Sequence, residues 1–248
     1  MRTAARPRFS LPLRVSVVML DLDGALVDTA PDIAAGVNRM LRDVGMPVYP
    51  EATIVKWIGN GTQRLVKRAL TGRMDAEPAP TLYERAYPRF LAHYGQLLTR
   101  QSRPFPGVVD GLKALKRAGY RLVCVTNKAE IFTLPLLRQL DLLDYFDLVL
   151  SGDSLPRQKP DPLPLLHACA HFNAPPGHSV LVGDSSNDTQ AARAAGAPVI
   201  CVAYGYNHGG DVGALRADAT IANLGELPGH LRLYSANQSH EAHNDEME

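Results

Sequence analysis

The sequence is poor in cysteine and has no excess of charge of either sign. Its 248 residues include three scattered cysteines, Cys124, Cys169 and Cys201, each among apolar neighbours. Such a count excludes a disulfide-rich secreted scaffold and indicates buried, reduced thiols, so we expect a cytoplasmic protein. Lysine and arginine number 26 and aspartate and glutamate 25. This balance argues against a polyanionic partner such as nucleic acid.

Long apolar runs are also missing. None approaches the roughly eighteen residues that a membrane span needs, so no membrane partner is expected. The N-terminal stretch faintly resembles a signal peptide, but Arg14 interrupts its apolar part and no cleavage site follows. We therefore expect a disordered leader over residues 1–13. The polar, acidic residues 235–248 are expected to form a disordered tail.

Short apolar runs are present and alternate with helical patterns. Runs that are hydrophobic at nearly every position, separated by helices, are typical of a parallel sheet covered on both faces. The five runs span residues 15–20, 121–125, 146–150, 179–182 and 198–202. Apolar spacing and terminal glycine or proline predict helices over 107–117 and 187–195, and one starting at Asp161–Pro162.

Residues 31–105 break this alternation. They contain no clear strand, and their apolar spacing predicts helices over 32–44, 62–70 and 82–98. Pro88 interrupts the last of these, so a kink or two helices are expected there. The predicted fold is α/β. Its core domain comprises residues 14–30 and 106–234, and a helical domain over 31–105 is inserted after the first strand.

Polar side chains follow the ends of the predicted strands. Asp21 and Asp23 come after the first run and point the same way if the chain stays extended between them. Two like charges that close repel each other, and a divalent cation is the simplest way to offset them. The carboxyl ends of parallel strands share one edge of a sheet, where ligands bind. That edge would also receive Thr126, Asn127, Lys159, Asp184 and Asp188.

Each of these features has an ordinary explanation when taken alone. Paired aspartates often form a solvated turn, and the segment GDSSND is typical of a helix cap. Thr126–Asn127 is compatible with a plain turn and Lys159 with a surface lysine. These explanations do not account for four such features on successive strand ends, so we favour a catalytic site.

The motifs resemble those of the haloacid dehalogenase-like hydrolase superfamily. DLDGALVDT is similar to the family's DxDGTLxDS, Thr126–Asn127 to its hydroxyl motif, Lys159 to its lysine and GDSSND to its GDxxxD motif, over most of residues 17–205. Two segments, WIGNGTQRLVKRAL and SGDSLPRQKPDPLPL, most resemble the phosphoglycolate phosphatases of that superfamily. The resemblance implies a Rossmann-like sheet with a small C1-type helical cap. Ala25 replaces the usual threonine, a structural position, so we expect activity to survive.

The resemblance also implies a phosphoric monoester hydrolase with defined residue roles. Asp21 would be the nucleophile that forms an aspartyl phosphate, and Asp23 would protonate the leaving alkoxide and then accept a proton from water. Thr126, the Asn127 amide and Lys159 would bind the phosphoryl oxygens. Mg²⁺ would be held by Asp21, the backbone carbonyl of Asp23 and Asp184, with Asp188 orienting these ligands.

The choice of substrate is expected to depend on the cap. A loop containing Trp57, Asn60 and Arg64 could drop onto the site and exclude water, or Trp57 could belong to the cap core and Arg64 to a solvated face. For 2-phosphoglycolate, the expected substrate, Arg64 or Lys67 could bind the carboxylate. Three alternatives stay open: hydrolysis of another small phosphorylated metabolite, such as a phosphosugar or a nucleotide monophosphate; a phosphosugar mutase reaction; and, least favoured, a non-enzymatic binding protein. A monomer or homodimer is expected.

Overall fold

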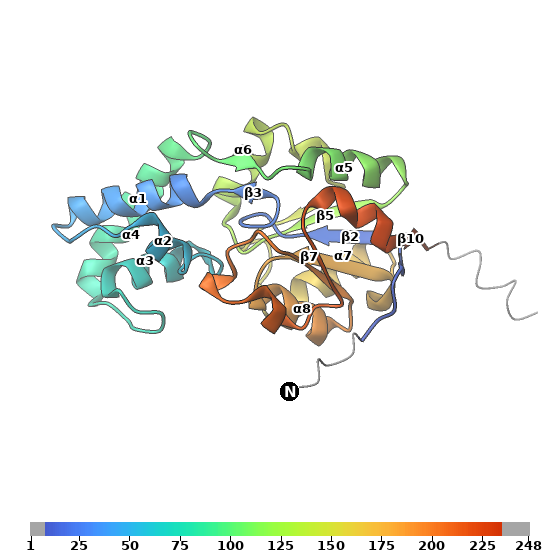
Figure 1. Ribbon diagram of the computed structural model, residues 1–248. Coiled ribbons are helices and arrows are strands. Elements are labelled where there is room, and N and C mark those ends of the chain that lie inside the picture. Colours follow the sequence, from blue (N-terminus) through green and yellow to red (C-terminus); the bar gives the residue numbers. More distant parts are fainter. Residues whose placement is uncertain (1–7, 235–248) are drawn as a thin grey trace, which may run out of the picture.

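The computed structural model describes residues 8–234. Within them, a six-stranded sheet of parallel pairs has the order β6-β5-β2-β7-β8-β9 (Figure 1). The strands are β2 (Val17–Leu20), β5 (Arg121–Val125), β6 (Leu148–Leu150), β7 (Ser179–Gly183), β8 (Val199–Val202) and β9 (Ala219–Ile221). The prediction of a parallel α/β sheet is confirmed. Strand β9 was not predicted, because its three residues lie in a polar segment.

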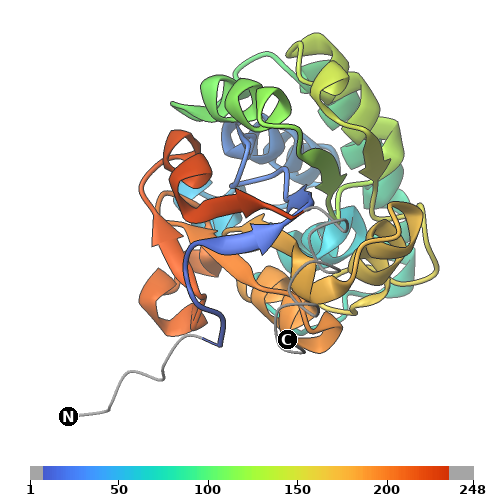
Figure 2. The ribbon, with the colours of Figure 1, turned by 90° about the vertical axis from the view of Figure 1, so that its right-hand side faces the viewer.

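Alternate residues of the strands face two separate hydrophobic layers, as the two-residue period of a strand requires. Val18 and Leu20 pack with helices α5 (Val108–Arg117) and α6 (Glu130–Gln139). Val17 and Met19 pack with helices α7 (Leu163–His171) and α8 (Ser186–Ala195). Figure 2 shows the sheet between the green and yellow-green helices above and the gold and orange helices below. Cys124, Cys169 and Cys201 are buried and free, as predicted.

Short elements complete the core. The first apolar run divides at Ser16, so that β1 (Leu13–Val15) pairs in parallel with β10 (Leu231–Leu233) outside the main sheet. The 3₁₀ helices are η1 (Leu143–Tyr145), η2 (Pro176–His178), η3 (Asn207–Gly209), η4 (Val212–Leu215) and η5 (Leu224–His230). None of the helices in the described part is long and apolar enough to cross a membrane.

The expectation of a disordered leader through residue 13 is wrong at its C-terminal end. The backbone N–H groups of Arg8 and Phe9 donate to the carboxylate of Asp218, and the Phe9 ring packs against the core. Leu13 already begins β1. The rest of the predicted leader, residues 1–7, and the predicted tail, 235–248, lie outside the described residues.

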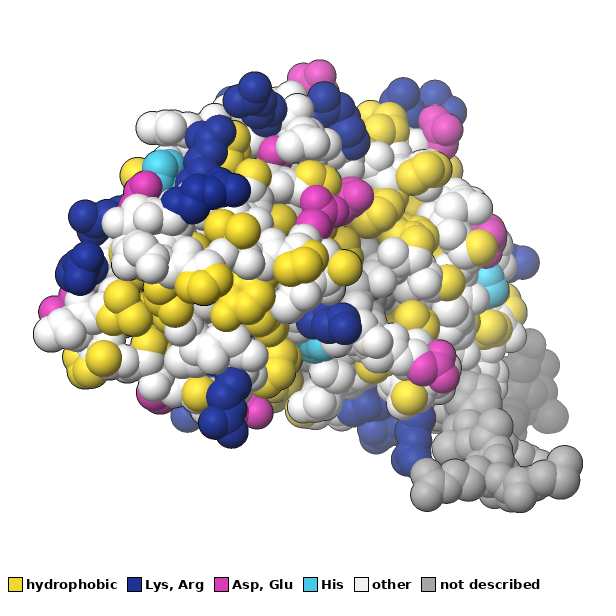
Figure 3. All heavy atoms as spheres, turned by 60° about the vertical axis from the view of Figure 1, so that its left-hand side comes forward, with side chains coloured by type: hydrophobic (Ala, Val, Ile, Leu, Met, Phe, Trp, Pro, Cys, Tyr) yellow, Lys and Arg dark blue, Asp and Glu magenta, His cyan; other side chains and the backbone are white. Residues whose placement is uncertain are grey.

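Four helices lie between strands β3 (Val27–Asp28) and β4 (Arg103–Pro104) and form the cap on the left of Figure 1. They are α1 (Ala30–Asp43), α2 (Glu51–Val55), α3 (Gly61–Thr71) and α4 (Pro80–Leu97). Helix α4 is not divided at Pro88, so the expectation of two helices there is wrong. Pro88 and Glu84, whose carbonyl loses its intrahelical partner, are both exposed, so water reaches that carbonyl. Figure 3 shows hydrophobic side chains spread over the outer face of the cap, between lysines and arginines.

Two linkers join the cap to the core, and they are bonded to each other. Strands β3 (Val27–Asp28) and β4 (Arg103–Pro104) form a short antiparallel pair. Asp32, which is fully buried in the first turn of α1, accepts bonds of 2.7–3.0 Å from the backbone of Gln101 and Ser102 and from the Ser102 hydroxyl. The predicted domain boundaries at 30/31 and 105/106 stay a prediction.

Candidate active site

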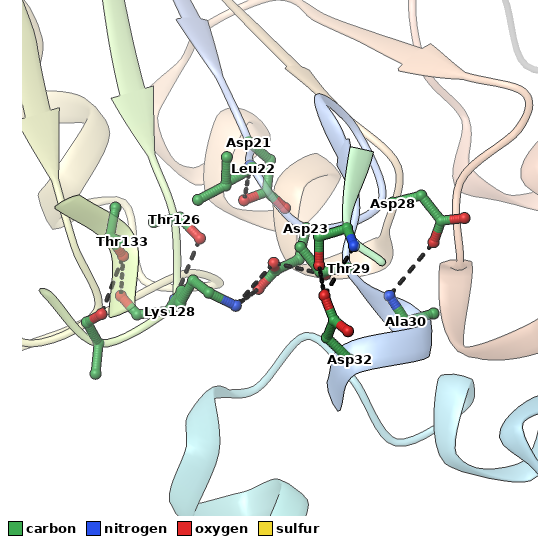
Figure 4. A network of polar contacts seen from close by, with 12 residues as sticks. Asp21, Leu22, Asp23, Asp28, Thr29, Ala30, Asp32, Thr126, Lys128 and Thr133 are labelled. Carbon is green, nitrogen blue, oxygen red and sulfur yellow. Dashed lines mark hydrogen bonds and ion pairs between the residues drawn. The ribbon is translucent and has the colours of Figure 1, made fainter. Parts of the chain in front are cut away.

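The carboxyl ends of the three central strands lie level with one another. Leu20, the last residue of β2, stands opposite Cys124 of β5 and Val182 of β7. The next residues along these strands carry the polar groups that the sequence singled out. Figure 4 shows Asp21, Asp23, Thr126 and Lys128 gathered at this edge. The strand register therefore explains why residues far apart in the sequence share one site.

A buried lysine joins two of the carboxylates. Lys159 Nζ lies 2.9 Å from Asp21 Oδ1 and 2.6 Å from Asp188 Oδ1, and its side chain is 2% exposed. Burial lowers the pKa of Lys159, but the charges of Asp188 and Asp21 outweigh that effect and raise it. The ammonium therefore stays charged inside the protein and offsets the negative charge beside it.

Asp188 has a structural role as well. Its Oδ2 accepts bonds from the Ser185 hydroxyl and from the backbone N–H groups of Ser185 and Asp184, which together fix the start of helix α8. Its Oδ1 is the oxygen paired with Lys159. The helix-cap explanation of GDSSND is therefore correct, and it uses one oxygen of the carboxylate, while the other oxygen pairs with Lys159. The catalytic role of this segment stays a prediction.

Three carboxylates are close enough to share a cation. One oxygen from each of Asp21, Asp184 and Asp188 lies within 4.8 Å of the others. Burial and, to a smaller extent, the charge of Asp188 raise the pKa of Asp21 to about 7 against the opposing charge of Lys159. Burial and then the charges of Asp188 and Asp21 also raise the pKa of Asp184. An oxygen-only cluster that needs more positive charge to stay ionised fits a hard divalent cation such as Mg²⁺.

Asp23 faces another set of partners. Its carboxylate accepts a bond of 2.8 Å from the Thr29 hydroxyl and lies 3.0 and 3.1 Å from Lys128 Nζ (Figure 4). The carboxylate thus stands apart from the three-carboxylate cluster, and the predicted use of its backbone carbonyl as a metal ligand stays a prediction. Sequence reasoning missed Lys128 and Thr29, although both lie in the quoted motifs or directly after them.

Thr126 and Asn127 are buried at the end of β5, at 3% and 7% exposed. The Thr126 hydroxyl accepts a bond from the Lys128 backbone N–H at 3.2 Å. Asn127 Nδ2 donates to the carbonyl oxygens of Gly59 and Lys159, both at 2.8 Å. The Asn127 side chain therefore links the core to the cap, and the predicted binding of phosphoryl oxygens by these two residues stays a prediction.

The loop between α2 and α3 is hydrogen-bonded to the core, and the carbonyl of Gly59 takes two of these bonds. Gly59 O accepts bonds from Asn127 Nδ2 and, at 3.1 Å, from Asn187 Nδ2, while Asn60 Nδ2 donates to Asn187 Oδ1 at 3.1 Å. Gly59 has φ = +122°, a conformation that side chains rarely adopt, and a Cβ there would press on the ring of His208. The glycine lets the loop approach the core this closely.

The other predicted cap residues lie elsewhere. Trp57 is buried edge-on against Tyr49, and its carbonyl accepts a bond from Arg68, so it belongs to the cap core. Arg64 pairs with Asp75 and Glu77 beside a separate polar groove. Neither Trp57 nor Arg64 lines the cavity at the sheet edge, and their proposed contact with substrate stays a prediction.

That cavity lies between core and cap. Core residues supply its polar side, including Asp21, Asp23, Lys128 and Asp184. The cap supplies a mostly apolar roof formed by Ile33, Ile58, Leu65, Phe90 and Tyr94. Carboxylates and a lysine on one side of a roofed cavity are suited to group transfer from a small ester.

Comparison with known proteins agrees with this geometry. The phosphoglycolate phosphatase of Thiobacillus denitrificans is 54% identical over 217 residues, which cover 88% of this chain and 96% of the relative. That of Nitrosospira multiformis is 56% identical over 215 residues, covering 87% and 95%. A crystal structure of a predicted phosphoglycolate phosphatase from Haemophilus somnus superposes with a TM-score of 0.83 at 34% identity, covering 87% of this chain and 97% of that one. Residues 18–202 match the family model described as haloacid dehalogenase-like hydrolase, and the chain belongs to that family.

Proposed function

We propose that this protein is a metal-dependent phosphomonoester hydrolase that uses Asp21 as its nucleophile and acts on 2-phosphoglycolate. The observation that carries the chemistry is the placement of Asp21, whose carboxylate stands at the end of the central strand β2, paired with Lys159 and grouped with Asp184 and Asp188. The substrate is supported by the relatives at 54% and 56% identity, which are named phosphoglycolate phosphatases.

The chemistry needs two proton transfers and one covalent intermediate. An Asp21 oxygen attacks phosphorus, the ester P–O bond breaks, and Asp23 gives its proton to the leaving alkoxide. Water then attacks the phosphorus of the aspartyl phosphate and gives its proton to Asp23, while the bond between the Asp21 oxygen and phosphorus breaks. Inorganic phosphate leaves and both carboxyl groups return to their starting states. The position of Asp23, two residues beyond the nucleophile and lining the same cavity, supports this division of roles.

The remaining polar groups of the sheet edge hold negative charge in place. Lys159 stands against Asp21, where it can stabilise the anionic phosphoryl group as the group transfers. A divalent cation bound by Asp21, the Asp23 carbonyl and Asp184 would add positive charge at the same position. Asp188 holds Lys159 and the start of α8 in place relative to these ligands.

We also infer that the substrate is a small phosphorylated metabolite, handled in the cytoplasm by a monomer or homodimer. The roof formed by the cap supports the size limit, because it leaves room for a leaving group of a few atoms rather than a polymer. Light scattering after size-exclusion chromatography measures the oligomeric state.

The first experiment is phosphate release from a panel of small phosphate esters, assayed with Mg²⁺ or with EDTA. We expect EDTA to abolish turnover and Mg²⁺ to restore it, and 2-phosphoglycolate to lead the panel in kcat/KM by about a hundredfold. Asp21→Asn, which keeps the side-chain volume but removes the nucleophilic carboxylate, should lower kcat by about 10⁴-fold or more.

The outcomes separate the alternatives. Metal-dependent but equal rates across the panel would mean that the chemistry is right and the substrate wrong. Formation of an isomeric phosphosugar without phosphate release would indicate a mutase. Full activity in the Asp21→Asn variant would remove the proposed mechanism.

A further inference from the structure

The cavity must recognise the part of the substrate that lies beyond the phosphoryl group. Among the described residues that line it, Lys128 is the one lysine or arginine. Lys159 is engaged with Asp21 and Asp188 and does not line the cavity. His208 does line it, but burial lowers the pKa of His208, which leaves the imidazole uncharged at pH 7. A negatively charged leaving group would therefore meet one fixed cation, Lys128.

Lys128 is held by its backbone as well as by its side chain. Its N–H donates to the Thr126 hydroxyl, and its carbonyl accepts bonds from the Gly152 N–H at 2.8 Å and the Thr133 hydroxyl at 3.1 Å. These three bonds fix the backbone position from which the Lys128 side chain extends, and Asp23 holds its ammonium group. A lysine fixed in this way is rare, because buried lysines lose hydration that only specific partners replace.

The ammonium group lies between the two domains. It is 3.0 and 3.1 Å from the oxygens of Asp23 and 4.8 Å from the centroid of the Tyr94 ring on cap helix α4. Asp23 is the group placed to protonate the leaving oxygen, so the ammonium stands where the leaving group begins. The aromatic ring on its other side favours the cation and keeps water away from it.

The Tyr94 hydroxyl adds a second donor. Tyr94 is 1% exposed, and its hydroxyl is buried without a hydrogen-bond partner among the described residues. A buried polar group of this kind calls for an explanation such as a ligand, because an unmade bond is costly. The other polar side chain that the cap adds to the lining, Thr62, is hydrogen-bonded to Tyr87, so a carboxylate entering the cavity has Lys128 and Tyr94 as its partners.

We propose that Lys128, held between Asp23 and the Tyr94 ring, binds the carboxylate of the leaving group and thereby selects 2-phosphoglycolate over uncharged esters of the same size. This inference rests on the proposed function. It replaces the cap cations Arg64 and Lys67, which pair with Glu77 outside this cavity, by a cation from the core.

The test compares two substrates of nearly equal size, 2-phosphoglycolate and ethyl phosphate, which lacks the carboxylate. The quantity measured is the ratio of their kcat/KM values. In Lys128→Met we expect this ratio to fall about 10- to 100-fold, the usual effect of losing one charge-assisted hydrogen bond. Arg64→Met is the matched control, because it removes a cap cation of similar length, and its ratio should stay at the wild-type value.

Comparing the ratio rather than a single rate separates recognition from the positioning of Asp23. If Lys128→Met lowers both substrates equally, Lys128 only orients Asp23, and the inference fails while the proposed function stands. If Arg64→Met collapses the ratio instead, the carboxylate binds the cap. If the wild type shows no preference for 2-phosphoglycolate, the proposed substrate fails first.

Circular dichroism would show whether Lys128→Met fails to fold. In that case two further variants test the inference. Lys128→Gln keeps a polar side chain and removes the charge, and it should lower the ratio as much. Tyr94→Phe removes only the hydroxyl and should lower the ratio by about tenfold or less. An unchanged ratio in the folded Lys128→Gln variant would overturn the inference.

Discussion

Two ion pairs of this molecule use similar groups in different surroundings. At the sheet edge, the Lys159 side chain is 2% exposed and the Asp188 side chain with which it pairs is fully buried. On the outer side of the cap, the Arg64 side chain is 26% exposed and that of its partner Glu77 is 60% exposed. Both contacts are short, at 2.6 and 2.8 Å. Distance alone does not tell them apart.

Solvent makes the difference. Water and dissolved ions screen a surface pair, so such a pair contributes little to stability and either member can be replaced. Removing one member of a buried pair leaves an uncompensated charge in a medium of low dielectric, which costs far more. We therefore expect the charges at the sheet edge to serve the proposed chemistry and those of the cap surface to be replaceable.

Removing the buried cation should have the largest effect. Lys159→Met leaves Asp21 and Asp188 facing each other without their shared partner. We expect kcat to fall about 10³-fold and the free energy of unfolding to fall by about 3–5 kcal/mol, measured by urea denaturation. Lys116→Met removes a half-buried lysine paired with Asp147 away from the site, and its kcat should be unchanged. Near wild-type activity in Lys159→Met would show that the buried pair is not catalytic.

A break in the contact between core and cap should have an intermediate effect. Asn187→Ala removes one of the two amides on Gly59 O and the acceptor of Asn60. We expect kcat/KM to fall about tenfold, the equivalent of one or two hydrogen bonds that hold the cap down, with little change in the unfolding midpoint. Asn223→Ala, in the turn before η5, is the control and should keep full activity. An equal loss in both variants would point to general destabilisation instead.

The smallest effect is expected at the cap surface. Arg64→Met removes the pairs with Asp75 and Glu77. The thermal midpoint should change by less than about 2 °C and kcat by less than about twofold, because both partners are well solvated. Calorimetry and a phosphate-release assay measure the two quantities. A large loss of activity at constant midpoint would mean that the polar groove beside Arg64 takes part in binding.

The sequence predicts the strands and the residues at their ends better than the contacts between core and cap. The apolar runs fix the strands, and the strands fix which residues follow them, so Asp21, Asp184 and the edge that they share could be predicted without coordinates. Three of the four cap helices were also visible in the apolar spacing, whereas the short helix α2 and the continuity of α4 through Pro88 were missed. Strand β9 and the bound segment around Phe9 were missed, because their stability comes from tertiary contacts rather than from local pattern.

The partners of Asp23 and the docking of the cap could not be predicted in this way. Lys128 reaches Asp23 across 105 residues and Asn187 reaches Gly59 across 128. No periodicity encodes such a contact, since it depends on how two separately patterned units pack. The available signal was positional: Lys128 follows Thr126–Asn127, the polar pair after β5.

Because the two linkers are paired, we expect the cap to rotate relative to the core about a single axis. Asp32 and the β3–β4 pair bind one linker to the other. The two linkers therefore act as one connection between cap and core, and not as two independent ones. We expect a body mounted in this way to move along one coordinate. The contacts at Gly59 and the contact of the cap roof with Lys128 would then break and form at the same time. Substrate would enter when both are open and would be enclosed when both are closed.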